Sequence, residues 1–196
     1  MGHWAQQAQS TQLPLRLVMD ATGFLHGNGM QPEKSWQHMN PEQMAHAFAI
    51  NAIGPALLMK HFLPLLARDG KAVFATLSAK VGSIGDNQLG GWYSYRASKA
   101  ALNMLWRTAS IEVARRRPDA VLLALHPGTV FSNLSAPFVA PGEARPGLMH
   151  PQDAAARGHA DAPAPARQGP QERRQVEGHP VGGRGAGAQA DQPALS

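Results

Sequence analysis

The chain has 196 residues, 43% of them hydrophobic, which is enough for one folded domain. Its formal charge of +5 lies entirely in residues 1–140, which excludes a basic C-terminal arm, and this excess is too small to indicate a nucleic-acid partner. The absence of cysteine excludes disulfides and thiolate chemistry.

Targeting signals are not recognisable near the start of the chain. Residues 1–20 lack the charged segment followed by an apolar run that a signal peptide would have. No apolar run reaches the roughly 18 residues that a membrane-spanning helix needs. We therefore expect a cytoplasmic protein without a membrane partner.

The first expected element is a buried strand at residues 15–19, where only Arg16 interrupts an apolar run. Residues 20–23, with the sequence Asp-Ala-Thr-Gly, follow it and are typical of a turn. Residues 24–39 contain scattered Gly, His and Pro, and we expect a loop there.

A helix is expected over residues 40–67. Asn40 can cap it, Pro41 suits its first turn, and Gln43 stands at the capping-box position. The pair Gly54-Pro55 interrupts the helical pattern, so we expect a kink or a restart at that point.

The rest of the pattern continues with strands, a loop and a second helix. Residues 72–77 form a buried strand, residues 78–91 a loop containing Gly and Ser, and residues 92–117 a long helix that ends before a proline. A third buried strand at residues 120–125 leads into a sharp turn at residues 126–128.

Apolar strands without alternation, joined by helices, predict an α/β fold with a parallel sheet covered on both faces. Right-handed crossovers place the carboxyl ends of all three strands along one edge. The turns at residues 20–23, 78–82 and 126–132 should therefore converge, and open α/β sheets bind their ligands at this edge.

Residues 141–196 differ sharply in composition from the expected domain at residues 1–140. Of these 56 residues, 35 are Ala, Gly, Pro or Arg, and none is Phe, Tyr, Trp or Ile. Such a segment buries too little surface to offset the entropy of ordering, so we expect a low-complexity, disordered tail. An out-of-frame reading of a GC-rich gene would produce the same composition.

The pair Tyr95 and Lys99 is the leading candidate for chemistry. Residues four apart share a helix face, with Cβ atoms roughly 5–6 Å apart. A lysine cation favours the phenolate and lowers the pKa of a tyrosine from its usual value of about 10. A tyrosine tuned in this way can act as general acid or base for a carbonyl/alcohol pair, although most Tyr-x-x-x-Lys pairs are surface contacts.

The surroundings of this pair resemble the short-chain dehydrogenase/reductase family, in particular its C-factor-like and sniffer-like branch. The resemblance runs from about Leu15 to Phe138, and its motifs follow the family's order. They are the turn at 20–23, Asn-Ala-Ile-Gly-Pro at 51–55, Leu-Ser at 77–78, Tyr-Ser-Tyr-Arg-Ala-Ser-Lys at 93–99 and Pro-Gly-Thr-Val at 127–130. The resemblance implies an incomplete Rossmann-like, doubly wound parallel sheet with flanking helices, forming part of a catalytic domain.

The resemblance also implies catalytic roles for four residues. Tyr95 would be the acid/base, Lys99 its pKa-lowering partner that also binds the nicotinamide ribose, and Asn51 the holder of a water in the proton relay. Ser78 would polarise the substrate carbonyl. The family places this serine three residues before a glycine, a position that holds an alanine here, so Ser83 is the alternative.

The same resemblance implies NAD or NADP as cofactor, with NADP slightly favoured. The residues implied to contact it are Asp20, Ala21, Gly23, Tyr95, Lys99, Pro127, Gly128, Val130 and Ser132. Asp20 replaces an Asn of the family and cannot donate an amide hydrogen bond, which should weaken sheet support or the cofactor contact. The Gly-rich strand, turn and helix that would select between the two cofactors are not found before Leu15.

No metal site is expected, because no two His share a helical face at i, i+4 spacing and no cysteine assists. The resemblance implies a small-molecule carbonyl or alcohol substrate and a homodimer through the helices at 41–67 and 92–117. Three interpretations stay open: an NAD(P)-dependent oxidoreductase, a catalytically inactive truncated fragment, and a non-catalytic association module. Cofactor binding distinguishes the first from the other two.

Overall fold

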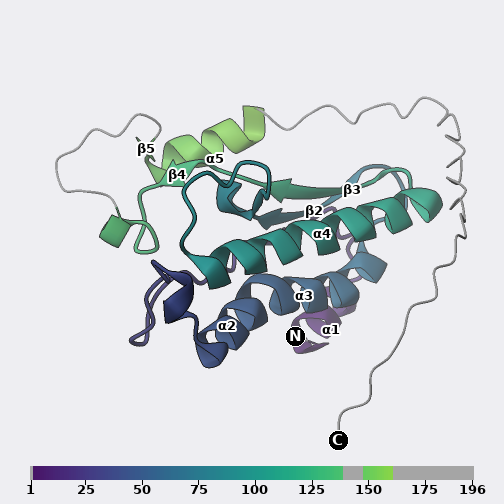
Figure 1. Cartoon of the computed structure of the whole chain (residues 1–196). Coiled ribbons are helices and arrows are strands. Elements are labelled where there is room, and N and C mark those ends of the chain that lie inside the picture. Colours follow the sequence, from purple (N-terminus) through teal and green to yellow (C-terminus); the bar gives the residue numbers. More distant parts are fainter. Residues whose placement is uncertain (1, 139–147, 161–196) are drawn as a thin grey trace, which may run out of the picture. The chain divides into compact units, whose positions relative to one another are not determined.

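The computed structural model describes residues 2–138 and 148–160, and Figure 1 shows how their helices and strands are arranged. The helices are α1 (Gly2–Ser10), α2 (Pro41–Phe48), α3 (Gly54–Phe62), α4 (Tyr93–Arg116) and α5 (Pro151–Ala160). The strands are β1 (Leu17–Asp20), β2 (Ala72–Leu77), β3 (Ala120–Leu125), β4 (Thr129–Val130) and β5 (Leu148–Met149).

The strands β1, β2 and β3 form a parallel sheet in that order, which confirms the predicted parallel sheet. β2 and β3 have the bounds expected from their apolar runs. β1 begins later than the expected strand, because Leu15 instead forms an isolated parallel bridge with Leu66. The Leu15 carbonyl accepts a hydrogen bond from the Ala67 amide at 2.8 Å, so the entry to the sheet is fixed against the segment that follows α3.

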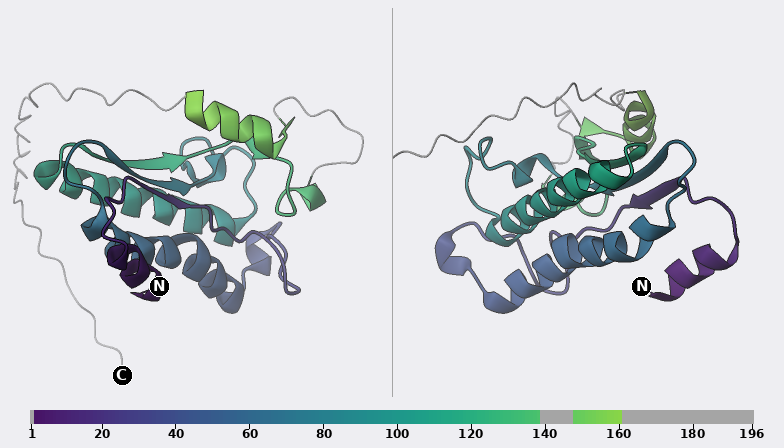
Figure 2. Two further views of the ribbon diagram at one scale, coloured as in Figure 1. Left: turned by 180° about the vertical axis from the view of Figure 1, so that it is seen from behind. Right: turned by 90° about the vertical axis from the view of Figure 1, so that its right-hand side faces the viewer.

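One face of this sheet packs against the helices. Alternate residues of β2, namely Ala72, Phe74 and Thr76, are fully buried. Phe74 meets Trp106 of α4 edge to face, with ring centroids 5.1 Å apart and an interplanar angle of 85°. Figures 1 and 2 show that α3 and α4 lie on the same side of the three strands, and the hydrophobic core fills the space between them.

The opposite face of the sheet is open at its first strand. Leu17 is 63% exposed and Met19 is 51% exposed. The prediction that helices cover both faces is therefore wrong for the residues that the structure describes. The strand order follows the chain order, so both right-handed crossovers run across the sheet in the same direction and place their helices on one face. The apolar strand sequences alone do not reveal the strand order.

The interruption predicted at Gly54-Pro55 is present as a π-helical segment, η2 (Ala49–Ile53), between α2 and α3. Because proline has no N–H, the carbonyl of Asn51 loses its usual helical donor four residues later. At the start of α2, Asn40 acts as the expected cap, and its Oδ1 accepts two backbone hydrogen bonds at 2.9 and 3.0 Å.

The stretch Pro41–Leu65 is long and apolar enough to cross a membrane by length and composition, which the apolar runs of the sequence did not predict. Only 22% of its most apolar window is buried. A single such helix is weak evidence of a membrane segment, because a helix that packs on a core passes the same test, and here η2 and α3 contact α4. The outward side of this stretch remains apolar and exposed.

Two further parts of the structure lie at the ends of the described chain. β4 and β5 pair in parallel, and α5 follows them. β5 and α5 fall within the stretch from 141 onwards that we expected to be a disordered tail, and the rest of that stretch lies outside the described residues. The N-terminal helix α1 was not predicted, because its sequence is polar and Gln-rich and Ala5 is its only buried residue among those described.

Candidate active site

Tyr95 and Lys99 lie in the first turns of α4 on the face directed towards the sheet. Both are buried, with 8% and 3% of their surfaces exposed. The Nζ atom of Lys99 lies 6.0 Å from the centroid of the Tyr95 ring. The four-residue spacing therefore places both side chains together, as the helical pattern predicted.

Lys99 anchors the pair to the carboxyl edge of the sheet. Its Nζ donates a hydrogen bond to the carbonyl of Leu77, the last residue of β2, at 2.9 Å. A Cβ added to Gly23, in the turn after β1, would lie 3.9 Å from this nitrogen and 3.9 Å from Asn51 Oδ1. The turn after β1, the end of β2 and the start of α4 therefore converge, as the topology predicted.

Burial dominates the electrostatics of this pair. It raises the pKa of Tyr95 above its ordinary value of 10.0. It lowers the pKa of Lys99, while the nearby carboxylate of Asp20 acts in the opposite direction. The expectation that Lys99 brings the phenol pKa towards neutrality is therefore wrong, because burial disfavours the phenolate and raises this pKa. Tyr95 holds its proton at neutral pH.

Asp20 is a buried carboxylate with defined partners. Its Oδ1 accepts hydrogen bonds from the Thr22 amide at 3.0 Å and the Thr22 hydroxyl at 2.7 Å, and its Oδ2 accepts one from the Thr76 hydroxyl at 2.8 Å. Asp20 therefore links β1 to β2 as an acceptor, with Thr76 as the donor, and the expected weakening of sheet support or of the cofactor contact stays a prediction.

Asn51 is fully buried, and its side chain joins three parts of the site. Its Oδ1 accepts a hydrogen bond from the Phe24 amide at 2.7 Å. Its Nδ2 donates to the Phe24 carbonyl at 2.8 Å and to Ser98 Oγ at 3.0 Å. Ser98 Oγ in turn donates to the Tyr95 carbonyl at 2.9 Å. Asn51 therefore ties the loop after β1 to the turn of α4 that carries Tyr95.

Asn51→Ala should lower the free energy of unfolding by about 1–3 kcal/mol, because the Phe24 amide and carbonyl lose their partners in a partly buried environment. Urea unfolding followed by tryptophan fluorescence measures the loss. Asn87→Ala is the matched control, since Asn87 is exposed and its side chain accepts only the Gly90 amide among the described contacts. A loss no larger than that of the control would show that the Asn51 side chain does not hold the site together.

Ser78 directs its hydroxyl to Asn103, two turns after Tyr95 in α4. Its Oγ donates a hydrogen bond to Asn103 Oδ1 at 2.6 Å, and Asn103 Nδ2 donates to the Gly82 carbonyl at 3.3 Å. Ser83, the alternative, ends the short 3-10 helix η4 (Lys80–Gly82). Among the described residues, neither hydroxyl bonds to Tyr95, and the carbonyl-polarising role of Ser78 stays a prediction.

The residues implied to contact a cofactor, other than the pair itself, come from two turns: Asp20, Ala21 and Gly23 after β1, and Pro127, Gly128, Val130 and Ser132 after β3. The first group lies beside Lys99, since Gly23 approaches its ammonium group and Asp20 acts on its pKa. The segment that carries the second group pairs with β5: Val130 lies opposite Met149, and the Phe131 amide donates to the Met149 carbonyl at 2.9 Å. A Cβ on Gly128 would lie 2.6 Å from Met149 Cε.

The donor groups of the pair fit the nicotinamide end of a dinucleotide. Within the described part of the chain, the Tyr95 hydroxyl forms no hydrogen bond, and Lys99 uses one of its three ammonium protons, on the Leu77 carbonyl. A phenol O–H and two remaining N–H groups on one helix face can bind ribose hydroxyls and a carbonyl oxygen.

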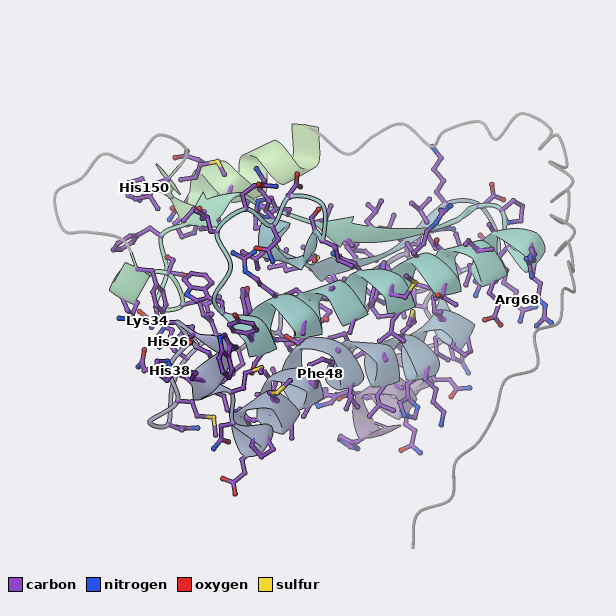
Figure 3. The ribbon with its side chains drawn as sticks, viewed as in Figure 1. His26, Lys34, His38, Phe48, Arg68 and His150 are labelled. Carbon is purple, nitrogen blue, oxygen red and sulfur yellow. The ribbon has the colours of Figure 1, made fainter. Side chains whose placement is uncertain are left out.

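Sequence reasoning missed two buried residues beside the pair. Ser98 bridges Asn51 and Tyr95, and its three-residue spacing from Tyr95 was the available signal. Glu33 is 3% exposed, although it belongs to the loop at residues 24–39, and no pattern pointed to it. Figure 3 shows side chains of this loop beside the N-terminal end of α4, among them His26, Lys34 and His38.

Much of the chain is similar in sequence to known proteins. A family model described as enoyl-(acyl carrier protein) reductase matches residues 17–130. The C-signal protein of Myxococcus xanthus is 40% identical over 95 residues, which are 48% of this chain and 55% of that protein. The short-chain dehydrogenase srdF of Neurospora crassa is 38% identical over 97 residues, which are 48% of this chain and 37% of that protein. The chain therefore spans about half or less of the length of these relatives.

Solved structures show the same fold. The carbonyl reductase Sniffer of D. melanogaster has a TM-score of 0.69 at 21% identity, with 85% of this chain and 67% of that chain covered. The NADPH-bound carbonyl reductase from chicken fatty liver has a TM-score of 0.62 at 28% identity, with 78% and 61% covered. These similarities confirm the predicted Rossmann-like α/β fold.

Proposed function

The chain belongs to the short-chain dehydrogenase/reductase family, and on that premise we propose that it is a nicotinamide-dependent reductase of a small-molecule carbonyl compound. The observation that carries this proposal is the pair Tyr95 and Lys99 at the carboxyl edge of the sheet. Tyr95 there holds its proton and, among the described residues, has no hydrogen-bond partner for its hydroxyl.

Proton transfer in this proposal runs through Tyr95. Burial keeps its pKa above 10.0, so the phenol can donate a proton to the carbonyl oxygen as that oxygen becomes an alkoxide. Lys99 is held by the Leu77 carbonyl, and its ammonium group would stabilise the phenolate that remains. When bound, a nicotinamide cofactor supplies the hydride.

A water at the backbone carbonyl of Asn51 would return a proton towards Tyr95. Both amide protons of the Asn51 side chain are already used, on Phe24 and Ser98, so the side chain is not free to hold a water through them. The backbone carbonyl is the better candidate, because Pro55 cannot donate the helical hydrogen bond that it would normally accept. The π-helical segment η2 creates this opening in the helix.

NADP is the cofactor that we propose, because the chicken carbonyl reductase among the similar structures binds NADPH. Tyr95 and Lys99 would hold the nicotinamide ribose, and the turn containing Gly23 would lie beside it. NAD is the alternative cofactor, and direct comparison of the two distinguishes them.

Cofactor binding by the full chain tests the proposal. The Trp92 ring lies 6.3 Å from the Tyr95 ring, so a cofactor bound at Tyr95 should change its fluorescence. We would titrate NADPH and NADH separately and assign the signal with the variant Trp92→Phe. If neither cofactor changes the fluorescence or releases heat in calorimetry, the proposed reductase function fails.

A second candidate function, as a non-catalytic association module, is supported by exposed apolar side chains on the helices predicted to dimerise. They are Ile53, Leu57, Met104, Leu105 and Ile111. Exposed apolar patches mark surfaces that bind other proteins. We propose that a second copy of this chain covers these helices, whether or not the chain is also an enzyme.

A dimer of this kind should be converted to monomer by Leu57→Glu or by Met104→Glu, because each places a desolvated charge in an apolar interface. Size-exclusion chromatography with light scattering measures the change, and Ile84→Glu in the exposed loop at residues 78–91 is the control. A dimer that survives both substitutions contradicts the proposed interface. A heterogeneous aggregate of the unmodified chain would support the fragment interpretation, with the open face at Leu17 and Met19 as its cause.

A further inference from the structure

The start of α4 lacks a capping side chain of its own. Trp92 occupies the cap position with φ 53° and ψ 44°, and its side chain forms no capping hydrogen bond. Gly90 and Gly91 precede it with φ of 64° and 65°, so three successive residues are left-handed. A bulky residue in this conformation is strained, and the first helical amides need acceptors. Another part of the chain must hold this turn.

Glu33 supplies the contacts that this helix end lacks. Its backbone carbonyl accepts a hydrogen bond from the Trp92 amide at 2.5 Å. Its Oε2 accepts one from the Ser94 amide at 3.2 Å, and its Oε1 accepts one from the Ser94 hydroxyl. A Cβ on Gly91 would lie 3.4 Å from the Glu33 carbonyl oxygen, so the two chain segments approach closely. Two of the four residues before Tyr95, Trp92 and Ser94, therefore form hydrogen bonds with Glu33.

The start of α4 also accounts for the burial of the Glu33 carboxylate. A buried carboxylate is costly unless polar groups surround it. In the part of the chain that the structure describes, Glu33 forms no salt bridge, and the ion pair present is Arg16 with Asp69. The Ser94 donors and the positive end of the α4 dipole are therefore what stabilise this carboxylate.

We propose that Glu33 is a positioning residue that fixes the Tyr95 phenol for proton transfer. Tyr95 directly follows Ser94, so any movement of the first turn of α4 relative to Glu33 also moves the phenol. Glu33 lies in the loop at residues 24–39 and bonds to Trp92, which directly follows the loop at residues 78–91, so the two loops meet at the start of α4. The role rests on the function proposed for Tyr95.

Titration of the Tyr95 phenol tests this role without requiring turnover. The chain contains 2 Tyr, so Tyr93→Phe leaves Tyr95 as the single phenol of the full chain. In that background, tyrosinate absorbance should give a pKa above 10.0, because Tyr95 is buried. Adding Glu33→Ala should lower it towards about 10, because the frayed first turn exposes the phenol. Glu33→Gln should retain most of the elevation, since its amide oxygen still accepts one hydrogen bond from Ser94.

Arg117→Ala is the matched control at the other end of α4. Arg117 donates hydrogen bonds to the carbonyls of Leu63 and Ala67, so its loss destabilises the chain without touching the first turn. Amide hydrogen exchange of residues 93–98 provides a second measurement at neutral pH. Glu33→Ala should accelerate exchange there, and Arg117→Ala should not.

Equal effects of Glu33→Ala and Arg117→Ala on the phenol pKa and on exchange would overturn the proposal. If Glu33→Ala does not fold, Ser94→Ala takes its place, because it removes the hydroxyl contact and keeps the amide contact. Ser94→Ala should shift the phenol pKa in the same direction by a smaller amount, and an unchanged pKa would overturn the proposal. A chain that binds neither NADPH nor NADH would refute the reductase function instead, and both measurements on Tyr95 could still be made.

Discussion

Tyr95→Phe should lower kcat for carbonyl reduction by a factor of about 10²–10⁴. The substitution removes the hydroxyl that donates the proton and keeps the aromatic ring that packs beside Trp92. The proton moves only as the carbonyl oxygen gains charge, so the loss should fall mainly on kcat. KM for NADPH should rise by a smaller factor, because the same hydroxyl is proposed to hold the nicotinamide ribose. NADPH absorbance in steady-state assays, with a panel of aldehydes and ketones, measures both constants.

Tyr93→Phe is the matched control, because Tyr93 lies on the same helix and is only half-buried. The raised pKa of Tyr95 adds a pH dependence: a phenol that has lost its proton cannot donate it, and burial should keep that proton in place throughout the neutral range. A decline within the neutral range would contradict the effect of burial on Tyr95. Full activity in Tyr95→Phe, with an active unmodified chain, would remove Tyr95 from the mechanism.

The parallel sheet could be predicted because its information is local. The apolar runs at 72–77 and 120–125 are too short for core helices and are separated by a helical pattern, which left few alternatives. The open face at Leu17 and Met19 could not be predicted in the same way. Strands of a parallel sheet are apolar on both faces. This apolar pattern is the same whether or not the described residues cover the second face of the sheet, so the sequence does not show what lies there.

Tyr95 and Lys99 could be brought together from the sequence because a helix fixes their spacing. The hydrogen bonds of Asn51 to Phe24 and of Glu33 to Ser94 join residues far apart in the chain, and no periodic pattern marks such partners. The expected direction of the Tyr95 pKa shift, towards neutrality, was wrong for a related reason. Spacing shows that a cation is near, but burial, which here has the larger effect, depends on the whole fold.

The position of Lys99 depends on a close approach that the sequence did not reveal. The short helix η4 contacts α4, and a Cβ on Gly82 would lie 2.8 Å from the backbone carbon of Lys99 and 2.9 Å from its Cβ. A third contact, with Asn103 Nδ2, would be 3.0 Å long. The two shortest contacts are with atoms at the base of Lys99, which cannot move away unless α4 moves.

Gly82→Ala should therefore lower the free energy of unfolding by about 1–3 kcal/mol, because an added methyl group overpacks this contact. The same shift should draw the Lys99 ammonium group away from the Leu77 carbonyl, so the activity of the folded variant should fall through kcat. Urea unfolding and steady-state kinetics on the same preparation separate the two effects.

Gly85→Ala is the control for this substitution, because a Cβ there meets nothing within 4 Å and no positive φ favours glycine at that position. Its unfolding free energy and kcat should match those of the unmodified chain. If Gly82→Ala matches them as well, η4 can yield without moving α4, and the alignment of Lys99 with Tyr95 does not depend on Gly82. If Gly82→Ala loses stability and keeps kcat, the contact supports the fold but does not position Lys99.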